Sequence, residues 1–208
     1  MTDVLTLAAA LLVAGPLVGA VCLFYPPFWR VWTVPREEHL ALVAAHPFAW
    51  KLVNVGFTVA TVTSAAGLAL MAGSMQAGNG PRAIALAGAF AYAIAGTLWC
   101  AMLAIRTRTT PALAALVAAG APTEPVETMI GSVNGGLFAS FTITTGVALV
   151  VICTTLALAG VVVAPLAWLA TGIAAFAVAG FLAFGDMIPA VLYFPTLMVG
   201  LGLLLGWS

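Results

Sequence analysis

The chain alternates between long apolar stretches and short polar breaks. Each apolar stretch has about the 20 residues that a helix needs to cross the hydrocarbon core of a bilayer. The apolar positions run continuously and do not alternate with polar ones, so helices are expected rather than strands. The pattern therefore predicts an all-α, polytopic bundle of six transmembrane helices in one domain, at residues 5–24, 50–73, 83–105, 130–158, 161–183 and 188–207.

Two shorter segments between the predicted spans, residues 36–46 and 111–120, cannot cross a bilayer. Thr110 followed by Pro111 is typical of a helix start, because the hydroxyl can cap the helix and proline suits its first position. Both segments are therefore expected to form short helices on the cytoplasmic side, at the membrane surface or against the bundle.

The composition excludes a water-soluble fold. Of the 208 residues, 64% are hydrophobic and 6% are charged, and the mean hydropathy is +1.20, whereas a soluble domain carries about 25% charged residues. The lipid bilayer is thus the first expected partner. The formal net charge is zero and no basic arm is present, so nucleic-acid binding is not expected.

Lysine and arginine residues set the expected orientation. The first stretch is expected to remain as a helix, since Asp3 precedes it and no lysine or arginine does, unlike in a signal peptide. With six spans, Arg82 lies alone on one face of the membrane. The other five basic residues share the opposite face: Arg30, Arg36, Lys51, Arg106 and Arg108. The positive-inside bias then predicts that both termini lie outside the cytoplasm, with a bacterial plasma membrane as the expected location.

Two short patterns recur along the chain. Ala-Leu-Val-Ala-Ala occurs at 41–45 and at 115–119, and Val-Asn-x-Gly occurs at 53–56 and at 133–136. Each Val-Asn-x-Gly lies near the start of a span, and the two spans run in the same direction, so a parallel duplication is geometrically allowed. The pattern predicts that the second and fourth spans lie close together near Asn54 and Asn134.

Asn54 and Asn134 each lie about one helical turn inside an apolar run. A side-chain amide that faces lipid leaves its hydrogen bonds unmade, so both are expected to turn inward. They can hold neighbouring helices together, at about 0.6–2 kcal/mol per hydrogen bond, or they can line a polar cavity that opens to the cytoplasm. Both interpretations stay open at this point.

Ionisable side chains converge at the same end of the predicted bundle. His46 precedes the second span, Glu127 the fourth and Asp186 the sixth. Together with Asn54 and Asn134, these are the predicted ligand-binding residues, at the cytoplasmic mouth. Asp186 can pair with His46, Arg106 or Lys51 from a neighbouring helix, or it can stabilise the start of the helix that follows it, where negative charge is favoured.

The sequence supports no metal or haem site and identifies no cofactor. His39 and His46 are seven residues apart, which is about 10.5 Å along a helix and too far for one zinc ion. Glu37, Glu38 and His39 are expected in a solvated rim, with His46 facing inward. The three cysteines are isolated in different spans, and no phosphate-binding loop is present.

These observations favour a membrane protein without a catalytic motif, acting as an accessory or assembly subunit or as a binder of a lipophilic small molecule. Another membrane protein or a second copy of the chain would be its partner. Two alternatives are a small transporter or channel with a cytoplasm-facing polar vestibule, and a redox or metal enzyme that uses His46. The first hypothesis is preferred because no span centre carries a charge. No motif identifies a family.

Overall fold

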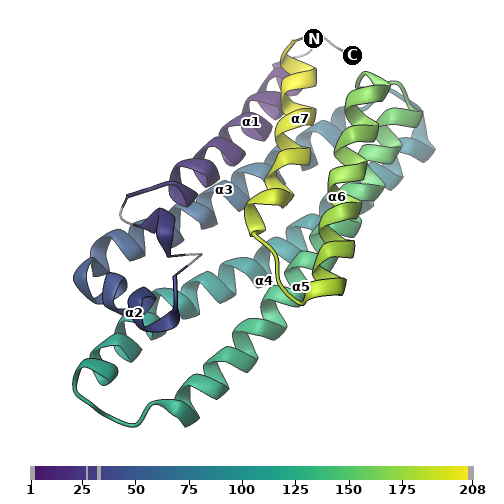
Figure 1. Ribbon diagram of the computed structural model, residues 1–208. Coiled ribbons are helices and arrows are strands. Elements are labelled where there is room, and N and C mark those ends of the chain that lie inside the picture. The colour runs from purple at the N-terminus through teal and green to yellow at the C-terminus, as the bar shows by residue number, and fades with distance from the viewer. Residues whose placement is uncertain (1–2, 27, 32–33, 206–208) are drawn as a thin grey trace.

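The computed structural model describes residues 3–26, 28–31 and 34–205, and every regular element within these ranges is helical (Figure 1). The predicted all-α class is therefore confirmed. The elements, in chain order, are α1 (Asp3–Leu23), η1 (Phe28–Arg30), α2 (Arg36–Ala45), α3 (Pro47–Ser74), α4 (Asn79–Ala118), α5 (Glu124–Leu158), α6 (Ala164–Phe184), η2 (Pro189–Leu192) and α7 (Tyr193–Leu204), where η1 and η2 are short 3-10 helices.

The long elements form a closed ring in chain order. α1 packs on α3, α3 on α4, α4 on α5, α5 on α6 and α6 on α7, and α7 packs back on α1. Successive members run in opposite directions, so that α1 begins and α7 ends at the same end of the bundle (Figure 1). The opposite end, where α2 lies, is called the far end below.

Five helices, α1, α3, α4, α5 and α6, are long and apolar enough to cross a membrane. The last predicted span is shorter, since η2 and α7 together cover Pro189–Leu204. With about 2.0 Å of rise per residue in a 3-10 helix and 1.5 Å in an α-helix, this segment is about 26 Å long, close to the roughly 30 Å of a hydrocarbon core.

Small residues allow the helices to approach closely where the ring is tightest. A methyl group on Gly15 of α1 would lie 2.8 Å from the carbonyl oxygen of Ala60 on α3. One on Gly88 of α4 would lie 2.6 Å from a side-chain carbon of Ile152 on α5. Because lipid tails are as apolar as the helices, close packing of this kind holds helices together in a bilayer.

The prediction of a separate short helix at 111–120 is wrong. α4 runs without interruption through Pro111 to Ala118, for 40 residues. Proline removes one backbone donor, and the helix continues because its last turns pack on α2, where Leu40 forms a small buried cluster with Leu113 and Ala114. The other short segment, 36–46, is a helix as expected, over Arg36–Ala45. α5 also begins before the predicted start, so α4 and α5 project beyond the other helices at the far end (Figure 1).

The prediction that the second and fourth spans meet near the two asparagines is also wrong. α4 lies between α3 and α5 in the ring. The aromatic side chains show this arrangement directly, because the ring of Trp99 on α4 lies 6.4 Å from that of Phe57 on α3 and 4.7 Å from that of Phe141 on α5. The repeated Ala-Leu-Val-Ala-Ala segments instead end two neighbouring helices, α2 and α4.

Candidate functional site

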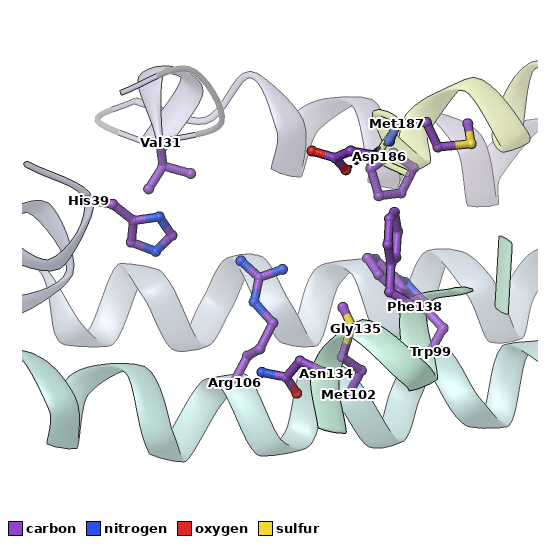
Figure 2. Close-up of a pocket in the computed structure, with 11 residues that line it drawn as sticks. Val31, His39, Trp99, Met102, Arg106, Asn134, Gly135, Phe138, Asp186 and Met187 are labelled. Carbon is purple, nitrogen blue, oxygen red and sulfur yellow. Dashed lines mark hydrogen bonds between the residues drawn. The ribbon is translucent and has the colours of Figure 1, made fainter. Parts of the chain in front are cut away.

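A cavity of about 360 Å³, called the inner cavity below, opens between α2, α4, α5 and the connection from α6 to η2 (Figure 2). Polar and aromatic side chains from elements far apart in sequence line it together. Its lining residues are Val31, His39, Trp99, Met102, Arg106, Asn134, Gly135, Phe138, Asp186, Met187 and Pro189.

A second hollow of about 510 Å³, the outer cavity, lies next to it between α2, α4 and α5. The two share His39, Arg106 and Asn134, so these three residues lie between adjacent cavities at the far end. The remaining residues of the outer cavity are Arg36, Leu40, Thr110, Leu113, Glu127, Thr128, Ile130 and Gly131.

Glycines on α5 leave room for this space. Gly131 lines the outer cavity, and Gly135, one turn later, lines the inner one. A methyl group added to either would meet no atom within 4 Å. The absence of side chains at these two positions adds to the open space, and larger residues there would project into the cavities.

Arg106 is the cation of the site. Its guanidinium points from α4 into the inner cavity (Figure 2) and also lies over the ring of Trp50, 5.2 Å from the ring centre. Trp50 is fully buried, and its indole N–H donates a hydrogen bond of 3.2 Å to the backbone carbonyl of Arg106. α3 thus fixes both the backbone and the side chain of this arginine.

His39 approaches the same space from α2. Its ring meets the ring of Trp50 edge to face, with 5.4 Å between the ring centres. Burial, and to a smaller extent the positive charges of Arg106 and Arg36, lower the pKa of His39 to about 4. The imidazole is therefore neutral at pH 7, and it can donate one hydrogen bond and accept another.

Hydrogen-bond acceptors face these donors. The side-chain oxygen Oδ1 of Asn134 on α5 is buried and has no hydrogen-bond partner among the described residues. The carboxylate of Asp186 lies across the cavity from Asn134 (Figure 2), and one of its oxygens accepts a 2.7 Å hydrogen bond from the backbone N–H of Met187. A ligand head that both accepts and donates hydrogen bonds suits this combination.

One end of the inner cavity is aromatic. Trp99 and Phe138 lie there, away from His39 (Figure 2). Their ring centres are 6.0 Å apart. Phe181 of α6 packs edge to face on Phe138, with 5.7 Å between the ring centres. Flat apolar groups pack well on such rings, so the cavity offers a polar half and an aromatic half.

The structure brings together three of the five predicted ligand-binding residues. Asn134 and Asp186 line the inner cavity, and Glu127 lines the outer one, where it forms an ion pair with Arg36. Asn54 turns inward as expected and is buried, but its side-chain N–H₂ donates to the Trp50 carbonyl of its own helix, 2.8 Å away. It lines neither cavity.

Each of the two histidines lies in the environment that was expected for the other. His46 is exposed at the corner between α2 and α3, where its ring meets Phe28 at 6.4 Å, and it lines neither cavity. His39, expected in the solvated rim, is half-buried and lines both. Pro47 starts α3 directly after His46, so the chain turns there, and this turn points His46 away from the bundle.

Sequence reasoning missed the two residues that organise the site, Arg106 and Trp50. Sequence reasoning treated Arg106 as one of five charges that set orientation and as one possible partner of Asp186, and it treated Trp50 as an aromatic anchor at the membrane interface. Their separation of 56 residues gives no local signal. The basic residue directly after a long apolar run was the available hint, since a charge at that depth needs partners.

Within the described residues, no group of three or more histidine, cysteine, aspartate or glutamate side chains could hold a metal ion. No family model matches the chain, and comparisons with curated proteins and with solved structures gave no significant match. The inference of function therefore depends on the site itself.

Proposed function

We propose that this protein is a non-catalytic integral membrane protein that binds a lipophilic small molecule through the polar head of that molecule. The observation that carries the proposal is the composition of the inner cavity. It combines the Arg106 guanidinium, a neutral His39 and the Asn134 oxygen, which no described residue hydrogen-bonds, with the aromatic rings of Trp99 and Phe138.

The pattern of donors and acceptors favours a head with a hydroxyl or carbonyl group. Such a group can accept a hydrogen bond from Arg106, and a hydroxyl can also donate one to the Asn134 oxygen. An aromatic head would in addition pack beside Trp99 and Phe138. The site thus suits a hydroxylated aromatic compound with an apolar substituent.

The proposed setting is a bacterial plasma membrane, with six crossings and with the far end in the cytoplasm. The ring of antiparallel helices and the excess of basic residues on one side support this orientation. The cavity would then open at the cytoplasmic interface, where amphipathic molecules place their heads. An accessory role beside another membrane protein, or in a homo-oligomer, is compatible with binding of this kind.

The first test fills the cavity from one side. Gly135 lines the inner cavity and has open space beside it, so Gly135→Leu places a side chain in the cavity. Gly136 is the next residue of α5 and lines neither cavity, so Gly136→Leu is the matched control. Binding of 4-butylphenol to the protein in lipid nanodiscs is measured by calorimetry against empty nanodiscs. We expect Gly135→Leu to abolish binding and Gly136→Leu to retain it. Equal binding by both variants would refute the proposed site.

The second test removes the cation. Arg106→Gln is compared with Arg108→Gln, because Arg108 lies on the same helix, is exposed and lines neither cavity. A hydrogen bond from a charged donor is worth about 1.5–3 kcal/mol, so we expect Arg106→Gln to weaken butylphenol binding by at least about tenfold. The Arg108→Gln variant should bind as the unmodified protein does. A loss of the same size in both variants would show a general charge effect and contradict a role for Arg106 in the cavity.

A further inference from the structure

The segment from Asp186 to Val191 separates two spaces of opposite character. Asp186, Met187 and Pro189 line the inner cavity. Ile188, Ala190 and Val191 line a groove of about 260 Å³ on the outer side of the bundle, between α1 and η2–α7. The other lining residues of this groove are Pro16, Leu17, Ala20, Leu23, Phe24, Tyr193, Phe194 and Leu197, so its walls are almost entirely apolar.

A third hollow lies next to both spaces. It has a volume of about 210 Å³ and is lined by Asp186, Met187, Ile188 and Pro189. Three of these residues also line the inner cavity, and Ile188 also lines the groove. The inner cavity, the hollow and the apolar groove therefore lie side by side along residues 186–189, and only this short segment stands between the cavity and the groove.

The floor of the groove is formed by the packed ring of Tyr193. Tyr193 is buried, and its hydroxyl forms a 2.8 Å hydrogen bond with the hydroxyl of Thr61 on α3. On the other wall, a methyl group on Gly19 would lie 3.4 Å from the Tyr193 ring, so α1 lies directly against this ring. Leu17, Phe24 and Phe194, by contrast, are more than half exposed and form the rim. The rim lies on the outer surface of α1 and α7. In a membrane, the hydrocarbon chains of the lipids would surround this surface.

From the adjacency of a polar cavity and an apolar groove we infer that the protein holds a single amphiphile, with its head in the inner cavity and its alkyl or isoprenoid chain passing over residues 186–189 into the groove between α1 and η2–α7. The inference rests on the proposed function for the position of the head. A bilayer lipid can touch the groove without entering the cavity, because association gains little from moving one apolar chain from lipid to an apolar wall. The distinguishing property is that the chain in the groove is tethered to a head held by Arg106.

A photoreactive probe tests this tether. The probe is 4-dodecylphenol with a diazirine midway along its chain, added to the protein in nanodiscs, irradiated and mapped by mass spectrometry. We expect labelling of 16–24 and 188–197 to exceed that of the lipid-facing positions Leu169 and Phe176 on α6, which are 56% and 75% exposed. A dodecane probe with the same diazirine and no head should label both regions equally.

Three variants complete the experiment. Arg106→Gln should remove the excess labelling of the groove, and Arg108→Gln should keep it. Ala20→Trp, which places a large ring at an exposed groove position, should remove the excess and still bind 4-butylphenol. Excess labelling that persists in Arg106→Gln, or its absence in the unmodified protein while butylphenol binds, would refute the tethered chain and leave the head site intact. Absence of butylphenol binding to the unmodified protein would overturn both proposals.

Discussion

Trp50 is the residue on which the polar half of the site is built. It is fully buried at the start of α3, and its ring contacts Phe28 at 5.6 Å and His39 at 5.4 Å, while Arg106 lies over it at 5.2 Å. An aromatic face attracts a cation by about 0.5–2 kcal/mol, depending on how far the pair is removed from water. One side chain therefore holds an arginine and a histidine, from two other helices, in contact with the cavity.

The buried position of His39 gives a prediction for its titration. With a pKa of about 4, caused first by burial and then by the charges of Arg106 and Arg36, its ring stays neutral well below pH 6.5. The chain has two histidines, so His46→Gln leaves His39 as the only one. We expect its ring signals in NMR spectra to shift near pH 4, and to shift at a higher pH when Arg106→Gln is added.

This shift has a consequence for stability. The unfolded chain binds a proton at His39 near pH 6.5, whereas the folded protein binds it only near pH 4. The stabilising contribution of a neutral His39 is therefore complete above pH 6.5 and is lost progressively as the pH falls to about 4. A titration midpoint near pH 6.5 for His39 would show that its ring is solvated and would contradict the packing described.

The close contact of Gly15 with α3 predicts that a larger residue at this position destabilises the fold. Gly15→Ala adds a methyl group 2.8 Å from the Ala60 carbonyl oxygen, and overpacking of this kind costs about 1–3 kcal/mol. Gly172→Ala in α6 meets nothing within 4 Å, and alanine is the better helix former by about 0.5–1 kcal/mol. Thermal unfolding in detergent should show a lower midpoint for Gly15→Ala and an unchanged or higher one for Gly172→Ala. Equal midpoints would show that α1 and α3 are not in such close contact.

The long helices could be predicted from the sequence, but the packing of α2 on the last turns of α4 at the far end could not. Continuous apolar runs specify a buried or lipid-facing helix whatever its neighbours are, so α1, α3, α4, α5 and α6 were all expected from the sequence. The Thr110-Pro111 pair follows a local rule for helix starts, and the packing of Leu113 and Ala114 on Leu40 overrides that rule. A contact 73 residues apart in the chain cannot be found by reading either segment alone.

The residues of the candidate site were also only partly predictable from the sequence. Asn134, Glu127 and Asp186 were predicted because polar residues near the start of an apolar run must face protein or water. His39 and Arg106 were not, because their places depend on how α2 folds back on α4 and on the ring of Trp50. Which of two histidines faces the cavity depends on the turn at His46 and Pro47, and periodicity does not describe that turn.

Docking of α2 on α4 predicts an asymmetry between two leucines of α4. Leu113 is 9% exposed and packs with Leu40, whereas Leu116 is 41% exposed. Leu113→Ala should therefore loosen α2, and Leu116→Ala should not. Amide hydrogen exchange over residues 36–45 is the measurement, with faster exchange expected only for Leu113→Ala.

The ion pair between Arg36 and Glu127 also joins α2 to α5, and Arg36 is more than half exposed. Exposed pairs contribute little because solvent and salt screen their attraction, so Glu127→Gln should increase the exchange of α2 less than Leu113→Ala does. If Glu127→Gln has the larger effect, the ion pair and not the apolar contact holds α2 in place.

At the scale of the whole molecule, ring closure explains why a short last helix belongs to the bundle. η2 and α7 pack on both α6 and α1 and complete the ring between the last and first helices. The same segment, with the connection that precedes it, forms the wall between the inner cavity and the outer groove. The η2–α7 segment thus borders both the cavity and the groove from which function is inferred. Whether this segment crosses the membrane decides the topology.

If the chain crosses the membrane six times, both of its ends lie on the same side, and the positive-inside bias of the five basic residues near the far end predicts that this side is outside the cytoplasm. In a bacterial host, we expect a C-terminal alkaline phosphatase fusion to be active and a C-terminal green fluorescent protein fusion to be dark. An N-terminal epitope tag should bind antibody in intact spheroplasts, and a tag inserted at residues 119–123, between α4 and α5, should bind it only after lysis. If the two ends are found on opposite sides, η2 and α7 do not cross, and the chain has five spans. If both ends are found inside, the basic residues face outward, and the cavity opens away from the cytoplasm.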